Sequence, residues 1–171
     1  MLIGLLSDTH DHQARTERAV QLLVDAGAEI FIHCGDLTGP RIVHACSVRP
    51  CYFVFGNNDV WGPGDQASAD TLRNAALEAG ATCLDWGGIV TLDGKSLAVT
   101  HGHLASEERH LLAHRPDYLL SGHTHVRHDH RASGVRLINP GALHRASEHT
   151  VALLDLATDE LRFLRVPKPP P

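Results

Sequence analysis

Short apolar runs alternate with helix-patterned stretches over the first half of the chain. Runs rich in aliphatic, aromatic and β-branched residues predict strands at 2–6, 29–33 and 51–55. Apolar positions that recur at helical spacing predict helices at 13–26 and 67–79. Alternation of strands and helices favours an α/β domain in which helices pack on a sheet.

The second half is richer in strands. Its apolar runs predict one helix, at 106–114, and six strands, at 88–92, 96–101, 118–122, 135–140, 149–156 and 161–166. The dipeptide Asp93-Gly94 between two of these runs is a hairpin signal. We therefore expect a mixed sheet, or two packed sheets with helices outside. We expect one domain over 1–166 and a flexible Pro-rich tail at 167–171.

Composition narrows the class of protein. A chain of 171 residues can bury one core unaided. Its formal charge of −5 argues against stable nucleic-acid binding and against attachment to an anionic membrane. The apolar start is too short for a signal peptide or a membrane span, so we expect a cytoplasmic protein. The four cysteines form no CxxC pair, and we interpret them as reduced residues of the core. The fourteen histidines are far above ordinary usage.

Polar side chains follow five of the apolar runs where each run ends. The five segments are Ser7-Asp8-Thr9-His10, Cys34-Gly35-Asp36, Gly56-Asn57-Asn58-Asp59, His101-Gly102-His103 and Gly122-His123-Thr124-His125. The carboxyl ends of neighbouring strands form one edge of an α/β sheet, and ligands bind there. We expect these side chains to converge.

Each segment alone has a simpler explanation. Asp8 could cap a helix, Gly35-Asp36 and Gly56-Asn57 could be turns, and His123 with His125 could face water. Together they form an ordered set of oxygen and nitrogen donors without thiolates. Such a set indicates a site for a borderline or hard divalent metal ion.

The ordered motifs resemble the calcineurin-like metallophosphoesterase superfamily. Asn139-Pro140-Gly141 adds a further match, and the small size without an inserted cap is similar to the YfcE-like prokaryotic subgroup. The resemblance runs from Leu2 to about Gly141. It implies a four-layer α/β/β/α sandwich of two mixed sheets flanked by helices, with two metal ions at the carboxyl ends of the strands.

The resemblance also implies a ligand set. Asp8, His10 and His125 would bind one metal ion, Asn57, His101 and His123 would bind the other, and Asp36 would bridge them. A shared carboxylate holds two cations about 3.5–4 Å apart, close enough to clamp a phosphoryl group and activate a water. Mn²⁺ is the preferred expectation, with Zn²⁺, Fe or Ni²⁺ as alternatives, because one N/O site accepts several of these ions.

Asn58 departs from the family pattern. Many relatives place there a histidine that protonates the leaving group, with the next acidic residue, here Asp59, orienting the ring. A carboxamide does not titrate usefully, so Asn58 cannot be that acid. His103 or His12 could substitute. His103 and Arg145 are also candidates for contact with a substrate phosphate. A solvated loop fits His103 equally well and is the favoured interpretation of Arg145.

The other histidines have no comparable setting, and we interpret them as surface residues or supports of the site: His33, His44, His110, His114, His128, His130, His144 and His149.

The function implied is a dinuclear metal-dependent phosphoesterase. It would hydrolyse phosphodiesters or activated phosphomonoesters by in-line attack of a metal-bridged hydroxide. A binding scaffold related to the metallophosphoesterase-like subunit of retromer is the alternative, and the change at Asn58 keeps it open. A DNA nuclease is the weakest alternative, because no basic stripe with aromatic platforms is visible. The natural substrate and the oligomeric state stay open.

Overall fold

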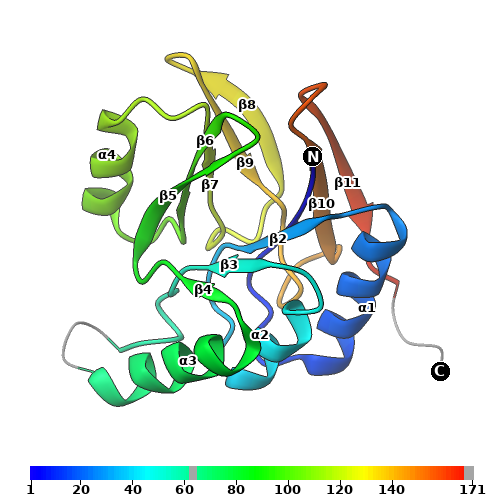
Figure 1. Ribbon diagram of the computed structural model, residues 1–171, viewed down its shortest axis with the longest axis vertical. Helices are drawn as coiled ribbons and strands as arrows, with labels where there is room; N and C mark the ends of the chain where they lie inside the picture. Colours follow the sequence, from blue (N-terminus) through cyan, green and yellow to red (C-terminus); the bar gives the residue numbers. More distant parts are fainter. Residues whose placement is uncertain (62–64, 168–171) are drawn as a thin grey trace.

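The computed structural model of this chain describes residues 1–61 and 65–167 and contains two mixed β-sheets (Figure 1). The first sheet has six strands in the order β11-β10-β1-β2-β3-β4. Its strands are β1 (Leu2–Leu6), β2 (Ile30–His33), β3 (Cys51–Phe53), β4 (Thr82–Cys83), β10 (Thr150–Asp155) and β11 (Glu160–Arg165). Strands β1 to β4 pair in parallel, and β10 pairs with both of its neighbours in antiparallel fashion.

The second sheet has five strands in the order β5-β6-β7-β9-β8. They are β5 (Gly87–Leu92), β6 (Lys95–Thr100), β7 (Tyr118–Leu120), β8 (His128–Ala132) and β9 (Val135–Asn139). The central pairs β6–β7 and β7–β9 are parallel, and both outer pairs are antiparallel. Asp93 and Gly94 form the β5–β6 hairpin turn, both with positive φ.

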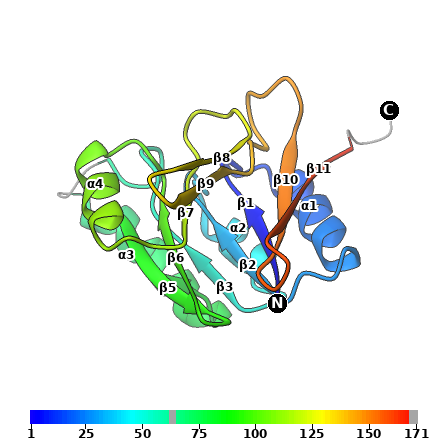
Figure 2. The same ribbon diagram turned by 90° about the horizontal axis from the view of Figure 1, so that it is seen from above.

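Helices cover the outer faces of both sheets, so the layers follow the order α/β/β/α (Figures 1 and 2). Helices α1 (Gln13–Asp25), α2 (Pro40–Cys46) and α3 (Gln66–Ala79) lie on the six-stranded sheet, and α4 (Ala105–Ala113) lies on the five-stranded sheet. The predicted four-layer sandwich of two mixed sheets is confirmed. No helix among the described residues is long and apolar enough to cross a membrane.

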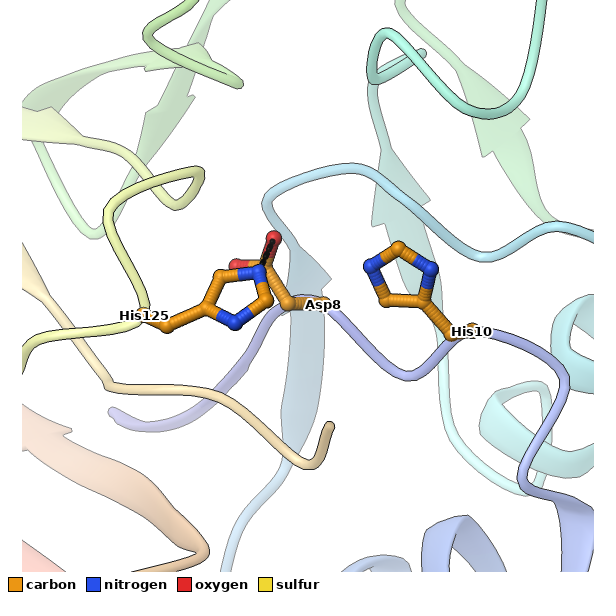
Figure 3. Close-up of side chains that lie close together, drawn as sticks. All are labelled: Asp8, His10 and His125. Atoms are coloured by element: carbon orange, nitrogen blue, oxygen red, sulfur yellow. Dashed lines mark ion pairs between the residues drawn. The ribbon is translucent and has the colours of Figure 1, made fainter. Parts of the chain in front are cut away.

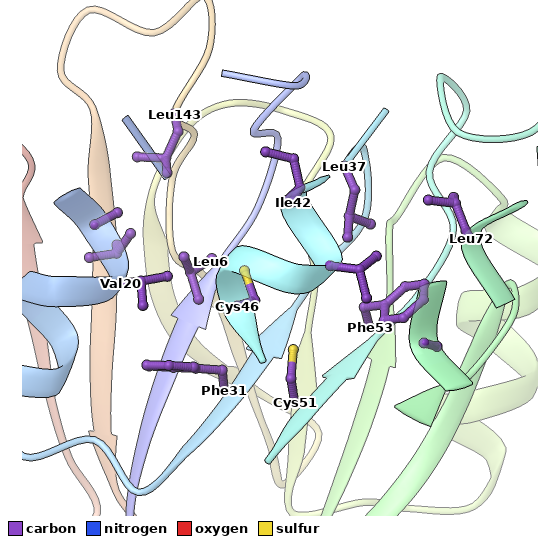
Figure 4. Packing of buried hydrophobic residues seen from close by; sticks show 14 of the residues in the cluster. Leu6, Val20, Phe31, Leu37, Ile42, Cys46, Cys51, Phe53, Leu72 and Leu143 are labelled. Atoms are coloured by element: carbon purple, nitrogen blue, oxygen red, sulfur yellow. The ribbon is translucent and has the colours of Figure 1, made fainter. Parts of the chain in front are cut away.

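Three apolar layers hold these elements together. Because strand side chains alternate between faces, Leu6 of β1 packs toward the helices while Ile3 and Leu5 pack between the sheets. The helix-side layer also contains Phe31 and Phe53, both fully buried (Figure 4). A smaller third layer joins α4 to the second sheet. Packing on both faces fixes the strand ends and therefore the loops that extend from them.

The predicted strands and helices are found with boundaries shifted by at most two residues. Three elements lie outside the sequence prediction. Helix α2 is short, and the only signals are Pro40 at its first turn and buried Ile42, Val43 and Cys46. Strand β8 is an exposed edge strand of sequence HDHRA, which has no apolar face to detect. Strand β4 has two residues. Most of the predicted tail, 168–171, lies outside the described residues.

Candidate metal centre

The loops after β1, β2 and β7 hold polar residues in the left-handed backbone region. Five predicted ligands have φ angles between 46° and 66°: Asp8, His10, Asp36, His123 and His125. Non-glycine residues seldom adopt this conformation, and clusters of it mark places where the structure fixes side-chain direction. The backbone N–H of Asp8 donates to the Gly35 carbonyl, and that of His10 donates to the Asp36 carbonyl, both at 3.0 Å. The first two loops are thereby locked together.

Asp8, His10 and His125 form the first group of candidate ligands (Figure 3). Their ligand atoms all lie within 4.8 Å of one another. Asp8 is fully buried, and its Oδ1 lies 3.1 Å from Nε2 of His125. Oδ2 is occupied, since it accepts hydrogen bonds from the Ser7 hydroxyl at 2.6 Å and the His123 backbone N–H at 3.1 Å. One carboxylate oxygen is thus held in place while the other faces the histidines.

Asp8, Asp36 and His101 form the second group, and their ligand atoms also lie within 4.8 Å of one another. Asp36 is 2% exposed, and its Oδ2 lies 3.3 Å from Nε2 of His10 and 3.5 Å from Nε2 of His101. It therefore stands between the imidazole of the first group and that of the second. A ligand that bridges two cations would need such a position, and Asp8 belongs to both groups as well.

Asn57 and His123 complete the second side of the centre. Oδ1 of Asn57 lies 3.2 Å from Nε2 of His101. The rings of His101 and His123 meet edge to face with centroids 5.1 Å apart. Both Asn57 and His123 are exposed, so this side is the more open one. The structure thus brings all seven predicted ligands to one edge of the two sheets.

His101 is held in a defined orientation. Its Nδ1 lies 2.8 Å from the carbonyl oxygen of Cys34, a contact in which Nδ1–H donates. That bond leaves Nε2, the atom that a metal ion would bind, facing Oδ1 of Asn57 and Oδ2 of Asp36. Because the ring is fully buried, its orientation is fixed by packing as well.

The charge state of Asp36 follows from its neighbours. Burial favours the neutral acid, but the nearby imidazoles of His10 and His101 outweigh it and hold the pKa of Asp36 well below its ordinary range. The carboxyl group is therefore ionised at neutral pH. An ionised bridge is what two cations would require.

Asn58 and Asp59 both form hydrogen bonds with Asp36. The backbone N–H of Asn58 donates to Oδ1 of Asp36 at 2.8 Å, and its side-chain Nδ2 donates to Oδ2 at 2.7 Å. Asp59 is buried, and its oxygens accept backbone N–H groups from Asp36, Thr38 and Gly56 at 2.6–2.8 Å. Burial raises the pKa of Asp59 to about 6, although the bonds from Gly56 and Thr38 oppose that rise. In this structure Asp59 joins two loops through its backbone partners, and its side chain is buried.

Close backbone approach explains two glycines of the motifs. A Cβ at Gly56 would lie 2.1 Å from Oδ1 of Asp36, and a Cβ at Gly122 would lie 1.9 Å from the Ser7 hydroxyl oxygen. Neither position leaves room for a side chain. Asn139 supports the last loop, because its Nδ2 donates to the Gly122 carbonyl at 2.7 Å. The Asn-Pro-Gly motif therefore braces the loop that carries His123 and His125.

The remaining predicted residues lie around this centre. The His103 ring lies 5.3 Å from that of His101 and 6.1 Å from that of His123. Burial, together with His101 and His123, lowers the pKa of His103 to about 4, so its imidazole is neutral. Arg145 is exposed, with a positive φ of 45°, in the loop after β9. It lies beside His144 in the chain, next to the first ligand group rather than within it.

His144 has a closer role than the sequence suggested. Its ring lies 4.4 Å from that of His10, and its Nδ1 lies 2.8 Å from Nε2 of His12. Burial and the neighbouring His10 lower the pKa of His144 to about 4. The position follows no strand directly, so the strand-end rule could not select it. The only signal was its place shortly after Asn139-Pro140-Gly141.

The donor set fits divalent cations. Within the described part of the chain, Oδ1 of Asp8 and Nε2 of His10 are buried without a hydrogen-bond partner. Buried polar atoms in native proteins almost always have a partner, so these two atoms are oriented for a ligand. Carboxylate, carboxamide and imidazole donors without thiolates suit first-row divalent metals.

Comparison with known proteins identifies the family. The model of the calcineurin-like phosphoesterase superfamily domain matches residues 1–159. Phosphodiesterase MJ0936 of Methanocaldococcus jannaschii is 29% identical over 168 residues, which cover 95% of this chain and 97% of that protein. Phosphodiesterase YfcE of Escherichia coli is 26% identical over 147 residues, 84% of this chain and 79% of that protein.

Solved structures agree with these relatives. A structure described as a novel archaeal phosphodiesterase has a TM-score of 0.79 and 28% identity, and covers 96% of this chain and 99% of its own. Vps29 of Entamoeba histolytica has a TM-score of 0.61 at 16% identity, covering 97% of this chain and 98% of its own, and shares the fold alone. Because the family model spans most of the sequence and agrees with the two-sheet fold, this chain belongs to the calcineurin-like phosphoesterase superfamily.

Proposed function

We propose that this protein is a dinuclear metal-dependent phosphoesterase that hydrolyses phosphodiesters, or activated phosphomonoesters, by in-line attack of an activated water. The observation that carries the proposal is the pair of ligand groups that share Asp8, one of them including Asp36. The names of the relatives MJ0936 and YfcE, both phosphodiesterases, support the same reaction.

Two divalent cations at this centre would act as Lewis acids on the attacking water and on the phosphoryl oxygens. Asp8, His10 and His125 would hold one cation, and Asn57, His101 and His123 the other. Asp36 would touch both, and the two hydrogen bonds from Asn58 fix its direction. Mn²⁺ is our preferred ion, with Zn²⁺, Fe or Ni²⁺ as alternatives, because imidazole and oxygen donors accept all of them.

The open side of the centre is where substrate would enter, because Asn57 and His123 are exposed there. The His103 ring lies next to the buried imidazole of His101 and the exposed imidazole of His123. Its Nδ1 has no hydrogen-bond partner among the described residues. We assign it contact with the phosphate or the leaving group, with Arg145 as a second phosphate contact. Asn58 contributes through Asp36 and supplies no proton.

A second candidate function is a binding scaffold. It is favoured by the carboxamide at Asn58, where a general acid would stand, and the Vps29 structures show that the fold occurs in proteins of that name. The intact ligand groups favour the enzyme over the scaffold.

Metal content and turnover decide between the two. Elemental analysis after loading with Mn²⁺ should give about two ions per chain, and bis(p-nitrophenyl) phosphate should then be hydrolysed. Removal of the metal with a chelator should abolish the activity, and Mn²⁺ should restore it. Two bound ions without turnover on any ester would favour the scaffold, and no bound metal would contradict both ligand groups.

A further inference from the structure

An apolar pocket of about 420 Å³ adjoins the open side of the metal centre. Asn57 and His103 line it, so the pocket and the centre share two residues. Its other walls come from the loop after β3, the segment before β5 and the start of α4: Val60, Trp61, Trp86, Leu104 and Glu107. A volume of this size suits a small organic group.

Two tryptophans, Trp61 and Trp86, provide aromatic surface in the pocket. Trp86 is anchored, because its ring packs edge-on against Phe55 with centroids 5.8 Å apart. Trp61 is 88% exposed, an unusual position for the largest apolar side chain. Exposed aromatic side chains beside a polar site are typical of surfaces that bind planar groups by stacking.

His103 connects the pocket to the centre. Its ring lies 5.8 Å from that of Trp86 on one side and 5.3 Å from that of His101 on the other. A phosphoryl group held between the candidate ligands would therefore place one of its ester substituents within reach of Trp86. We therefore expect the pocket to hold an ester substituent of the phosphate.

Charge restricts the substituent further. Glu107 is the only formally charged side chain that lines the pocket in the described part of the chain, and neither lysine nor arginine accompanies it. A carboxylate repels a second phosphate and accepts hydrogen bonds from N–H groups. An uncharged planar ring that carries N–H donors satisfies both conditions.

We propose that this pocket, defined by Trp61, Trp86, His103 and Glu107, binds a nucleobase attached to the phosphoester. The inference rests on the proposed function, since it names the substrate class of that site as nucleotide esters. Trp61 supplies the stacking surface and Glu107 the acceptor for a base amino group.

The test compares two ligands that differ in the base. Calorimetry on the Mn²⁺-loaded protein should give adenosine 5′-monophosphate an affinity about tenfold higher than that of ribose 5-phosphate, in line with the stacking of one base on an aromatic side chain. Trp61→Ala should weaken the binding of adenosine 5′-monophosphate alone, so that the two affinities become similar. Trp61→Phe should restore most of the difference. Leu77→Ala is the control: it removes an exposed apolar side chain on α3, away from the residues that line the pocket, and should change neither affinity.

A second measurement needs neither phosphate nor turnover. Trp61 and Trp86 are the only tryptophans of the chain, so tryptophan fluorescence reports on this pocket alone. Adenosine should quench it saturably and ribose should not. If adenosine quenches and binds as tightly as adenosine 5′-monophosphate while ribose 5-phosphate does not bind, the pocket stands and the proposed metal chemistry is wrong. If the two phosphates bind equally well and adenosine gives no quenching, the nucleobase assignment is overturned while the metal chemistry stands.

Discussion

Two pairs of histidines on different parts of this protein share the same ring spacing. At the candidate metal centre, the rings of His101 and His123 are 5.1 Å apart, and on the edge strand β8 the rings of His128 and His130 are also 5.1 Å apart. Each pair has one more exposed member, and each has an aspartate nearby. Ring proximity therefore does not distinguish a metal site from an ordinary surface.

The difference lies in what occupies the aspartates. On β8, both oxygens of Asp129 are taken by the Arg136 guanidinium, at 2.8 Å each. At the centre, Oδ1 of Asp8 has no hydrogen-bond partner among the described residues, and Asp36 faces imidazoles from two groups. A carboxylate already paired with arginine has little left to offer a cation, whereas buried carboxylates that face only imidazoles keep oxygens that a cation could bind.

The strongest test removes charge from each region in turn. Asp36→Asn should lower kcat/KM for bis(p-nitrophenyl) phosphate by roughly 10³-fold or more, because both cations lose their shared ligand. Each cation contributes several kcal/mol of transition-state stabilisation. Metal content should fall with it, while circular dichroism should show the fold retained.

Asp129→Asn is the matched control for this experiment. It disrupts the ion pair with Arg136 and should lower stability, but metal content and activity should stay near those of the parent protein. Two bound metals and a normal rate in Asp36→Asn would remove the bridging role.

The next test removes one exposed ring from each histidine pair. His123→Ala should reduce Mn²⁺-dependent hydrolysis by roughly 10²-fold, since one cation loses a direct ligand. His130→Ala should leave the rate unchanged. Both side chains are exposed, so neither variant should unfold. We expect losses like that of His123→Ala for alanine at His101 and His125. Equal losses across the two regions would point to general destabilisation.

The candidate ligands could be predicted from the sequence because strand ends obey a simple rule. Asp8, Asp36 and His101 each lie within three residues of the end of an apolar strand, and the carboxyl ends of such strands share one edge. The supporting groups could not be predicted this way. The bond from Asn139 to the Gly122 carbonyl and the approach of His144 to His10 depend on how the loop after β9 folds back.

The fold shows the same division between local and tertiary signals. Strands with a buried face leave a periodic pattern that the sequence reveals. Strand β8 leaves none, because its pairing with β9 is fixed by backbone hydrogen bonds and by Arg136 rather than by apolar side chains. The aromatic pocket is likewise invisible in the sequence, since Trp61 and Trp86 meet only through tertiary structure.

Asp59 extends the comparison to a third aspartate. Like those of Asp129, its oxygens are occupied, here by three backbone N–H groups. Asp59→Asn replaces one oxygen by an amide that cannot accept, so buried N–H groups lose a partner and the free energy of unfolding should fall by about 1–3 kcal/mol. Urea denaturation measures this change. Asp25→Asn, an exposed position at the end of α1, is the control and should cost almost nothing.

The smallest effect is expected for a gain of function at Asn58. If the chain lacks a general acid there, Asn58→His should speed the hydrolysis of esters with alkyl leaving groups, which need protonation in the transition state. Because Asp59 is buried and already accepts three backbone N–H groups, it is poorly placed to orient the new ring, and we expect a gain on the order of tenfold, below the 10²–10⁴ of an optimised acid. Esters of p-nitrophenol, whose leaving group is weakly basic, should gain less.

The measurement is kcat/KM for both ester types at matched metal occupancy, since the new imidazole could itself bind a cation. The pH profile of the variant should acquire an alkaline limb as the introduced imidazole loses its proton. Asn58→Gln serves as the control, because it keeps a carboxamide and adds no titrating group. If the ratio of alkyl to aryl rates does not rise above that of the parent protein, Asn58 does not stand in the acid's place, and the neutral His103 beside the centre becomes the group to test for proton transfer.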